Sequence, residues 1–98
     1  MRSFNVLTKN IKLKIGVLIS GNGSNLQSII NACNDSNFPA ELAIVISNKA
    51  DAYGLVRAKK FNIKTKVIEH ENFRHRSEFE KNINRALIEA NVELVCLA

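Results

Sequence analysis

The turn of residues 20–25, which reads SGNGSN, separates an apolar run from a segment with helical spacing. The apolar run, residues 13–19, predicts a strand, and Leu26, Ile29 and Ile30 predict a helix that reaches about residue 33. Glycines let the backbone turn sharply and approach a ligand closely, while the free N–H groups at the start of the helix point toward it. Strand, glycine turn and helix in this order predict an anion site, and a phosphate fits it best.

Strand and helix patterns alternate along the rest of the chain. Further strands are predicted at residues 42–46, 64–69 and 92–98, and further helices at residues 51–61 and 77–91. Asp51 is the expected N-cap of the first of these helices, and residues 77–80, SEFE, match a capping box, with the helix starting there or one turn earlier.

This alternation predicts a Rossmann-like α/β fold, β-α-β-α-β-α-β, with a four-stranded parallel sheet and helices on both faces. The strand at residues 64–69 carries lysines, which favour an edge position. If the second and third strands lie on one side of the first and the fourth on the other, a crevice opens between the ends of the first and fourth strands. The glycine turn lies at the lip of that crevice.

Composition limits the possible partners. The chain has 98 residues, enough for one domain, and its formal net charge of +5 comes from scattered lysines and arginines. This pattern favours small anionic ligands over nucleic acid, and no apolar run is long enough to cross a membrane. Cys33 and Cys96 form no metal-binding spacing, so we expect buried, reduced thiols, no metal and a cytoplasmic protein. Residues 1–12 are expected to be a disordered N-terminal tail.

The glycine turn departs from two better-known phosphate motifs. A dinucleotide fingerprint needs a third glycine where this chain has Leu26, and an acidic residue after the second strand, where the chain reads Ser47, Asn48 and Lys49. The Walker pattern is absent as well. The remaining interpretation is a monophosphate loop, with a tight turn that binds no ligand as the alternative.

Few other residues suggest a catalytic or ligand-binding role. His70 and His75 have no carboxylate at a telling spacing and no nearby nucleophile, so we interpret them as exposed. From the pattern alone, Arg76 is a solvated residue before the last predicted helix.

Three segments resemble the start of the phosphoribosylglycinamide formyltransferase family: VLISGNGSNLQSII, ISNKADAYGLVRA and FRHRSEFE. The resemblance covers about residues 14–98. It implies transfer of a formyl group from 10-formyltetrahydrofolate, as co-substrate, to the amine of glycinamide ribonucleotide in purine synthesis.

The resemblance also implies roles for particular residues. Gly23, Ser24 and Asn25 would hold the substrate phosphate, Gly21 and Asn22 would shape the loop, and Arg76 would contact the folate. The family's catalytic Asn, His and Asp lie in a second half, beyond the position that matches Ala98, so no catalytic residue is assigned here.

We therefore expect residues 13–98 to be the N-terminal, phosphate-binding half of a formyltransferase domain, truncated and inactive on its own. The last strand would leave an uncovered edge through which the chain associates. The alternative is a non-catalytic Rossmann-like binding module, and a nicotinamide-dependent oxidoreductase is disfavoured by the missing glycine and acidic residue.

Overall fold

A computed structural model describes residues 11–98 of the chain. The elements in chain order are β1 (Leu13–Ile19), α2 (Ser24–Cys33), β2 (Ala40–Ser47), α3 (Tyr53–Lys60), β3 (Thr65–Val67), the 3-10 turn η1 (His70–Asn72), α4 (Arg76–Glu89) and β4 (Leu94–Leu97). Residues 1–10, within the predicted tail, lie outside the described residues, and Ile11 and Lys12 precede β1 without regular structure.

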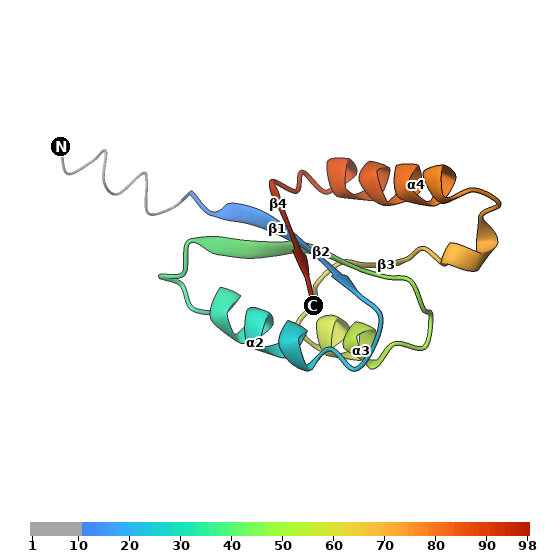
Figure 1. The fold of residues 1–98 in the computed structure, drawn as a ribbon. Helices are drawn as coiled ribbons and strands as arrows, with labels where there is room; N and C mark the ends of the chain where they lie inside the picture. The colour runs from blue at the N-terminus through green and yellow to red at the C-terminus, as the bar shows by residue number, and fades with distance from the viewer. Residues whose placement is uncertain (1–10) are drawn as a thin grey trace.

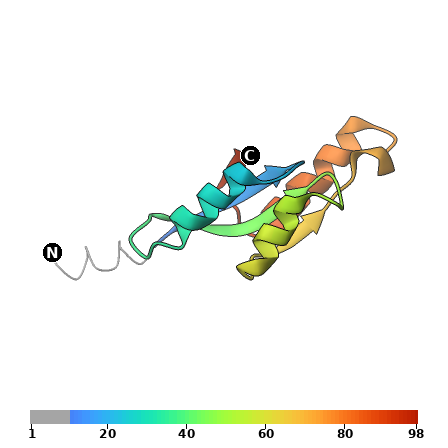
Figure 2. The ribbon, with the colours of Figure 1, turned by 90° about the horizontal axis from the view of Figure 1, so that it is seen from below.

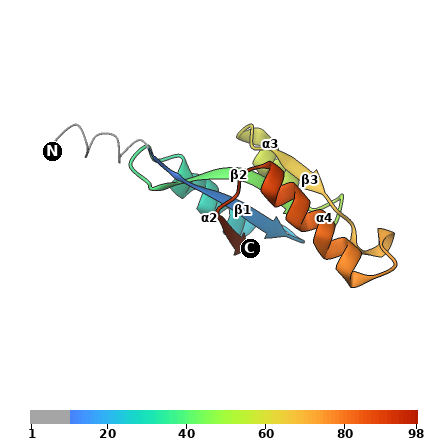
Figure 3. The ribbon, with the colours of Figure 1, turned by 90° about the horizontal axis from the view of Figure 1, so that it is seen from above.

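The four strands form one sheet in the order β3-β2-β1-β4, and every neighbouring pair is parallel. Helices α2 and α3 cover one face of this sheet, and α4 covers the other (Figures 1 and 2). Seen from the opposite side, α4 lies over the sheet, between β1 and β3 in the view (Figure 3). The predicted Rossmann-like α/β fold is confirmed, including the edge position of the third strand and the fourth strand beside the first.

Each face of the sheet has its own apolar core. Val17, Leu26 and Ile30 lie in the core under α2 and α3, whereas Ile44 and Leu87 lie in the core under α4. The register of β1 against β2 shifts between Ile15 and Gly16, where β2 holds one extra residue. This bulge reverses the alternation of side chains. Leu42 therefore packs toward α2 and Ile44 toward α4, and β2 is buried on both faces.

The predicted helix caps are wrong at two places. Ala52 is the N-cap residue of α3, without a side-chain cap bond, because the helix begins at Tyr53 and Asp51 lies one residue too early, exposed in the turn. His75 is the N-cap residue of α4.

The capping box at residues 77–80 does not form, because α4 begins one residue before it. Arg76 is the first helical residue, so Ser77 lies within the first turn. Glu80 pairs with the Arg76 guanidinium, 3.1 Å away, instead of reaching back toward Ser77.

Cys33 and Cys96 are free thiols that pack against the core under α2 and α3. Both are half-buried, which corrects the prediction of full burial, because Cys33 is the last residue of α2 and Cys96 lies in the edge strand β4. Burial raises the pKa of the Cys33 thiol above its ordinary value, so it stays protonated at neutral pH.

The two edges of the sheet differ in polarity. Strand β3 ends one edge with exposed Lys66, and β4 ends the other with Leu94, Val95 and Leu97, whose exposed fractions are 48%, 42% and 82%. In residues 11–98, no helix is long and apolar enough to cross a membrane.

Candidate functional site

The turn between β1 and α2 places free amides at the start of a helix. Gly23 is the N-cap residue of α2 and has a φ of 83°, in the left-handed region that favours glycine. The first bond of the helix runs from the Gln27 amide to the Gly23 carbonyl, 2.9 Å away. The amides of Ser24, Asn25 and Leu26 therefore have no carbonyl one turn earlier to bond.

Nothing negative lies within the first turn of α2. The N-cap makes no side-chain cap bond and the first turn holds no acidic residue. Ser24 and Asn25 are exposed. Free amides and the positive end of the helix dipole together make this segment a suitable place for an anion.

Two glycines from different elements touch behind the turn. A Cβ atom added to Gly23 would lie 2.6 Å from the Cα of Gly54, in the first turn of α3. A Cβ added to Gly54 would in turn meet the side chain of Ile19. The Gly54 amide donates to the Gly21 carbonyl at 3.2 Å. The turn is therefore fixed against α3 at backbone contact, which larger residues would prevent.

Arg57 joins the same turn from one helical turn further along α3. Its Nε donates to the Asn22 carbonyl at 3.0 Å, and its Nη2 donates to Asn22 Oδ1 at 2.8 Å. Its Nη1 donates to Gln27 Oε1 on α2 at 3.2 Å. The guanidinium also lies over the ring of Tyr53, 5.0 Å from its centre. One side chain thus links α3, the turn and α2.

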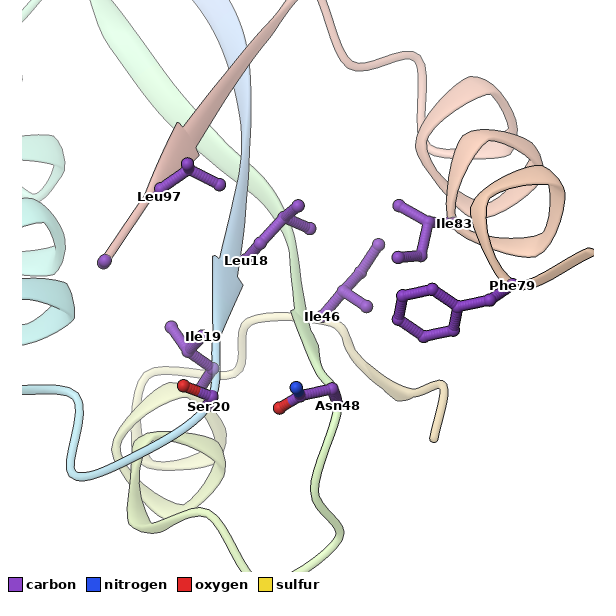
Figure 4. A pocket seen from close by; sticks show the side chains of 9 residues that line it. Leu18, Ile19, Ser20, Ile46, Asn48, Phe79, Ile83 and Leu97 are labelled. Atoms are coloured by element: carbon purple, nitrogen blue, oxygen red, sulfur yellow. The ribbon is translucent and has the colours of Figure 1, made fainter. Parts of the chain in front are cut away.

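A cavity of about 310 Å³ adjoins the turn at the carboxyl ends of β1, β2 and β4. Figure 4 shows Phe79 and Ile83 of α4 pointing toward Leu18 and Ile46 on the strands, while Ser20 and Asn48 lie close together at the strand ends. The cavity is therefore apolar on its α4 side and polar where the glycine turn begins. The cavity includes the predicted position between the ends of the first and fourth strands, but it also extends over β2 and α4, and Ser20 is the residue of the glycine turn that lines it.

Arg76 lines a second hollow that shares Leu18, Phe79 and Ile83 with the first. The structure thus brings Arg76 and the glycine turn to the carboxyl end of the sheet, with the cavity between them. Arg76 is 81% exposed and pairs with Glu80, so its guanidinium is accessible from solvent.

The two histidines do not contribute an evident catalytic pair. His70 packs edge-on against Phe79, with 5.2 Å between ring centres, and both His70 and His75 are exposed as predicted. Within residues 11–98, no group of three or more His, Cys, Asp and Glu side chains is placed to hold a metal ion.

The sequence interpretation missed Gly54 and Arg57. A glycine within a short helical pattern signals close backbone approach, and Arg57 follows it by three residues, on the same face of the helix. The segment that this face of α3 contacts could not be predicted, because nothing in the sequence shows that α3 packs against the turn after β1.

Comparison with known proteins gives consistent matches. The family model described as "Formyl transferase" matches residues 13–98. A phosphoribosylglycinamide formyltransferase of Haemophilus influenzae is 52% identical over 85 residues, which are 87% of this chain and 40% of that protein. The trifunctional purine biosynthetic protein adenosine-3 of Gallus gallus is 45% identical over 87 residues, 89% of this chain and 9% of that protein.

The fold is also similar to solved structures. The phosphoribosylglycinamide formyltransferase of Coxiella burnetii superimposes with a TM-score of 0.83 at 46% identity, covering 89% of this chain and 41% of that one. The chain therefore spans less than half the length of the formyltransferases that it matches.

Proposed function

The chain belongs to the formyl transferase family, and from this premise we propose that it supplies the substrate-phosphate site of an enzyme of purine synthesis. That enzyme would transfer a formyl group from 10-formyltetrahydrofolate to the amine of glycinamide ribonucleotide. In this proposal residues 13–98 are the phosphate-binding half of the formyltransferase domain. Similarity to proteins named phosphoribosylglycinamide formyltransferase supports the choice of substrate.

The observation that carries the proposal is the set of free amides at the start of α2. We assign the phosphate to Gly23, Ser24 and Asn25, with Gly21 and Asn22 shaping the turn around it. Three charge-assisted bonds of about 1.5 to 3 kcal/mol each would contribute about 5 to 9 kcal/mol. Association itself costs an estimated 4 to 15 kcal/mol, so the phosphate alone would bind weakly and the rest of the ligand must add contacts.

The formyl donor is assigned to the other end of the cavity. Arg76 offers a guanidinium, which suits the carboxylates of a folate. The apolar cavity between Arg76 and the turn separates the two assigned ligand positions. We assign no catalytic residue and no metal to residues 11–98, and we expect this chain to show no formyl transfer on its own.

Binding can be tested on the chain itself. Glycinamide ribonucleotide is titrated while the backbone amide signals of Gly23, Ser24 and Asn25 are followed by NMR, with glycinamide riboside, which lacks the phosphate, as the control ligand. We expect these signals to shift with the ribonucleotide at millimolar concentration and not with the riboside. Equal shifts with both ligands, or none, would contradict the phosphate assignment.

Activity is a separate measurement. Formyl transfer is assayed with the 98 residues alone, and a rate near that of an intact relative would show that catalytic groups lie within this chain. Binding of the ribonucleotide without transfer is the expected result. Association through the edge of β4 and a cytoplasmic location remain predictions.

A further inference from the structure

We propose that Arg57, on the neighbouring helix α3, is a positioning residue that holds the glycine turn in the geometry needed to bind phosphate. The inference rests on the proposed function, because it concerns the same site. It assigns Arg57 no contact with the ligand. Arg57 acts by holding Asn22 and Gln27, the residues on either side of the amides assigned to the phosphate, and by its positive charge near the start of α2.

The contacts of the Arg57 guanidinium surround the binding segment. Asn22 precedes Gly23, and both its carbonyl and its side-chain oxygen accept bonds from Arg57, at 3.0 and 2.8 Å. Gln27 follows the free amides and accepts a third bond at 3.2 Å. The segment from Gly23 to Leu26 is therefore held at both ends by one side chain. A planar guanidinium can donate in this forked way, which a lysine cannot.

The charge of Arg57 is not neutralised by these contacts. Its three acceptors are a peptide carbonyl and two side-chain amides, all neutral. Among residues 11–98, the one ion pair within 4.0 Å is that of Arg76 with Glu80. Arg57 therefore leaves a net positive charge beside the start of α2, where it adds to the helix dipole and favours a dianionic phosphate.

The base of the Arg57 side chain is itself fixed. The Gly54 amide of the same helix bonds the Gly21 carbonyl, and the Tyr53 ring lies under the guanidinium. Leu55 and Ala58 bury the opposite side of α3 in the core. Because these contacts anchor α3 to the core, Arg57 holds the turn in a position set by the core. A turn ordered in advance loses less entropy when ligand binds.

The test uses the chain as it stands and three variants. Arg57→Met keeps the length of the side chain and removes charge and donors, and Arg57→Lys keeps the charge without the fork. Arg85→Met is the matched control, because Arg85 is exposed on α4 and loses the same charge. Binding of glycinamide ribonucleotide and of inorganic phosphate is measured by NMR, together with the backbone order parameters of residues 22–25 without ligand.

We expect Arg57→Met to weaken binding of both ligands about tenfold, as loss of charge-assisted bonds implies. The order parameters of residues 22–25 should fall from about 0.85 to below about 0.7. Arg57→Lys should show the same loss of order with about threefold weaker binding. Arg85→Met should match the wild type in both measurements.

Two outcomes would overturn the proposal. One is a turn that stays rigid in Arg57→Met, and the other is binding by Arg57→Lys that equals the wild type. If Arg57→Met does not fold, Arg57→Lys decides alone. Failure of the wild type to bind either ligand would instead refute the proposed function, while the order parameters without ligand would still test whether Arg57 holds the turn.

Discussion

The glycine turn after β1 and the first turn of α4 both lie at the carboxyl end of the sheet, yet they are held in different ways. The glycine turn is fixed by backbone contact between Gly23 and Gly54 and by three bonds from Arg57. At the start of α4, Arg76 is 81% exposed and bonds only Glu80 among the described residues. One segment is held in place by contacts with the rest of the fold, and the other carries a charge that is largely exposed to solvent.

This difference indicates which of the two assigned substrates the chain binds more tightly. Fixing a free arginine side chain costs up to about 2 kcal/mol of rotamer entropy, whereas the amides of a fixed turn need no reordering. We therefore expect this chain to bind glycinamide ribonucleotide through the glycine turn more tightly than it binds a folate through Arg76. Arg76 should add little affinity until the rest of its binding site surrounds it.

The largest effect is expected for Gly23→Ala. A non-glycine residue at a φ of 83° costs about 1 to 3 kcal/mol, and the added Cβ would lie 2.6 Å from the Gly54 Cα, which a helix backbone cannot easily give way to. The free energy of unfolding should fall by about 2 to 4 kcal/mol in urea denaturation. Phosphate binding should be lost in the same variant, and a stable Gly23→Ala protein that still binds would refute the role of backbone contact.

A smaller effect is expected for Phe79→Ala at the start of α4. The ring contacts His70 edge-on and lies 5.9 Å from Phe73, and it lines the cavity. Because Phe79 is only half-buried, unfolding should become easier by about 1 to 2 kcal/mol, less than for a fully buried phenylalanine. Ile88→Ala, at a 72% exposed position of the same helix, is the control and should change stability by less than about 0.5 kcal/mol. Equal losses of stability in the two variants would show that the contacts among His70, Phe73 and Phe79 do not hold the start of α4 in place.

Gly21→Ala should separate stability from binding. A Cβ added there meets no atom within 4 Å, and Gly21 does not have a positive φ, so stability should stay within about 0.5 kcal/mol of the wild type. If the phosphate occupies the open space beside Gly21, a methyl group there should weaken binding of glycinamide ribonucleotide about tenfold. Unchanged affinity would limit Gly21 to shaping the turn. Thermal unfolding and an NMR titration measure the two quantities.

Local sequence patterns were enough to predict the fold and the sharp turn before α2. Apolar runs such as residues 42–46 and helical spacing such as Leu26, Ile29 and Ile30 depend on near neighbours in the chain, and the structure confirms the elements that they predicted. The glycines of the turn likewise predicted a sharp reversal before a helix, which Gly23 makes with its positive φ.

Contacts between distant segments were not predictable. Arg57 lies 35 residues from Asn22, and only the packing of α3 beside α2 brings them together. The capping prediction at residues 77–80 failed because α4 begins at Arg76, which places Ser77 inside the helix and leaves Glu80 one turn after Arg76. The local motif does not fix the residue at which the helix begins.

The smallest effect is expected for Arg76→Ala. Its ion pair with Glu80 joins residues four apart on an exposed helix face, and such pairs contribute about 0.3 to 0.5 kcal/mol. Stability in urea should fall by no more than this, and the difference should vanish in 1 M salt, which screens exposed charges. Glu80→Ala serves as the control, because it removes the same pair from the other side and should give the same result. A loss above about 1 kcal/mol in Arg76→Ala alone would mean that Arg76 supports the fold of α4, and the contrast between a fixed turn and a free arginine would then fail.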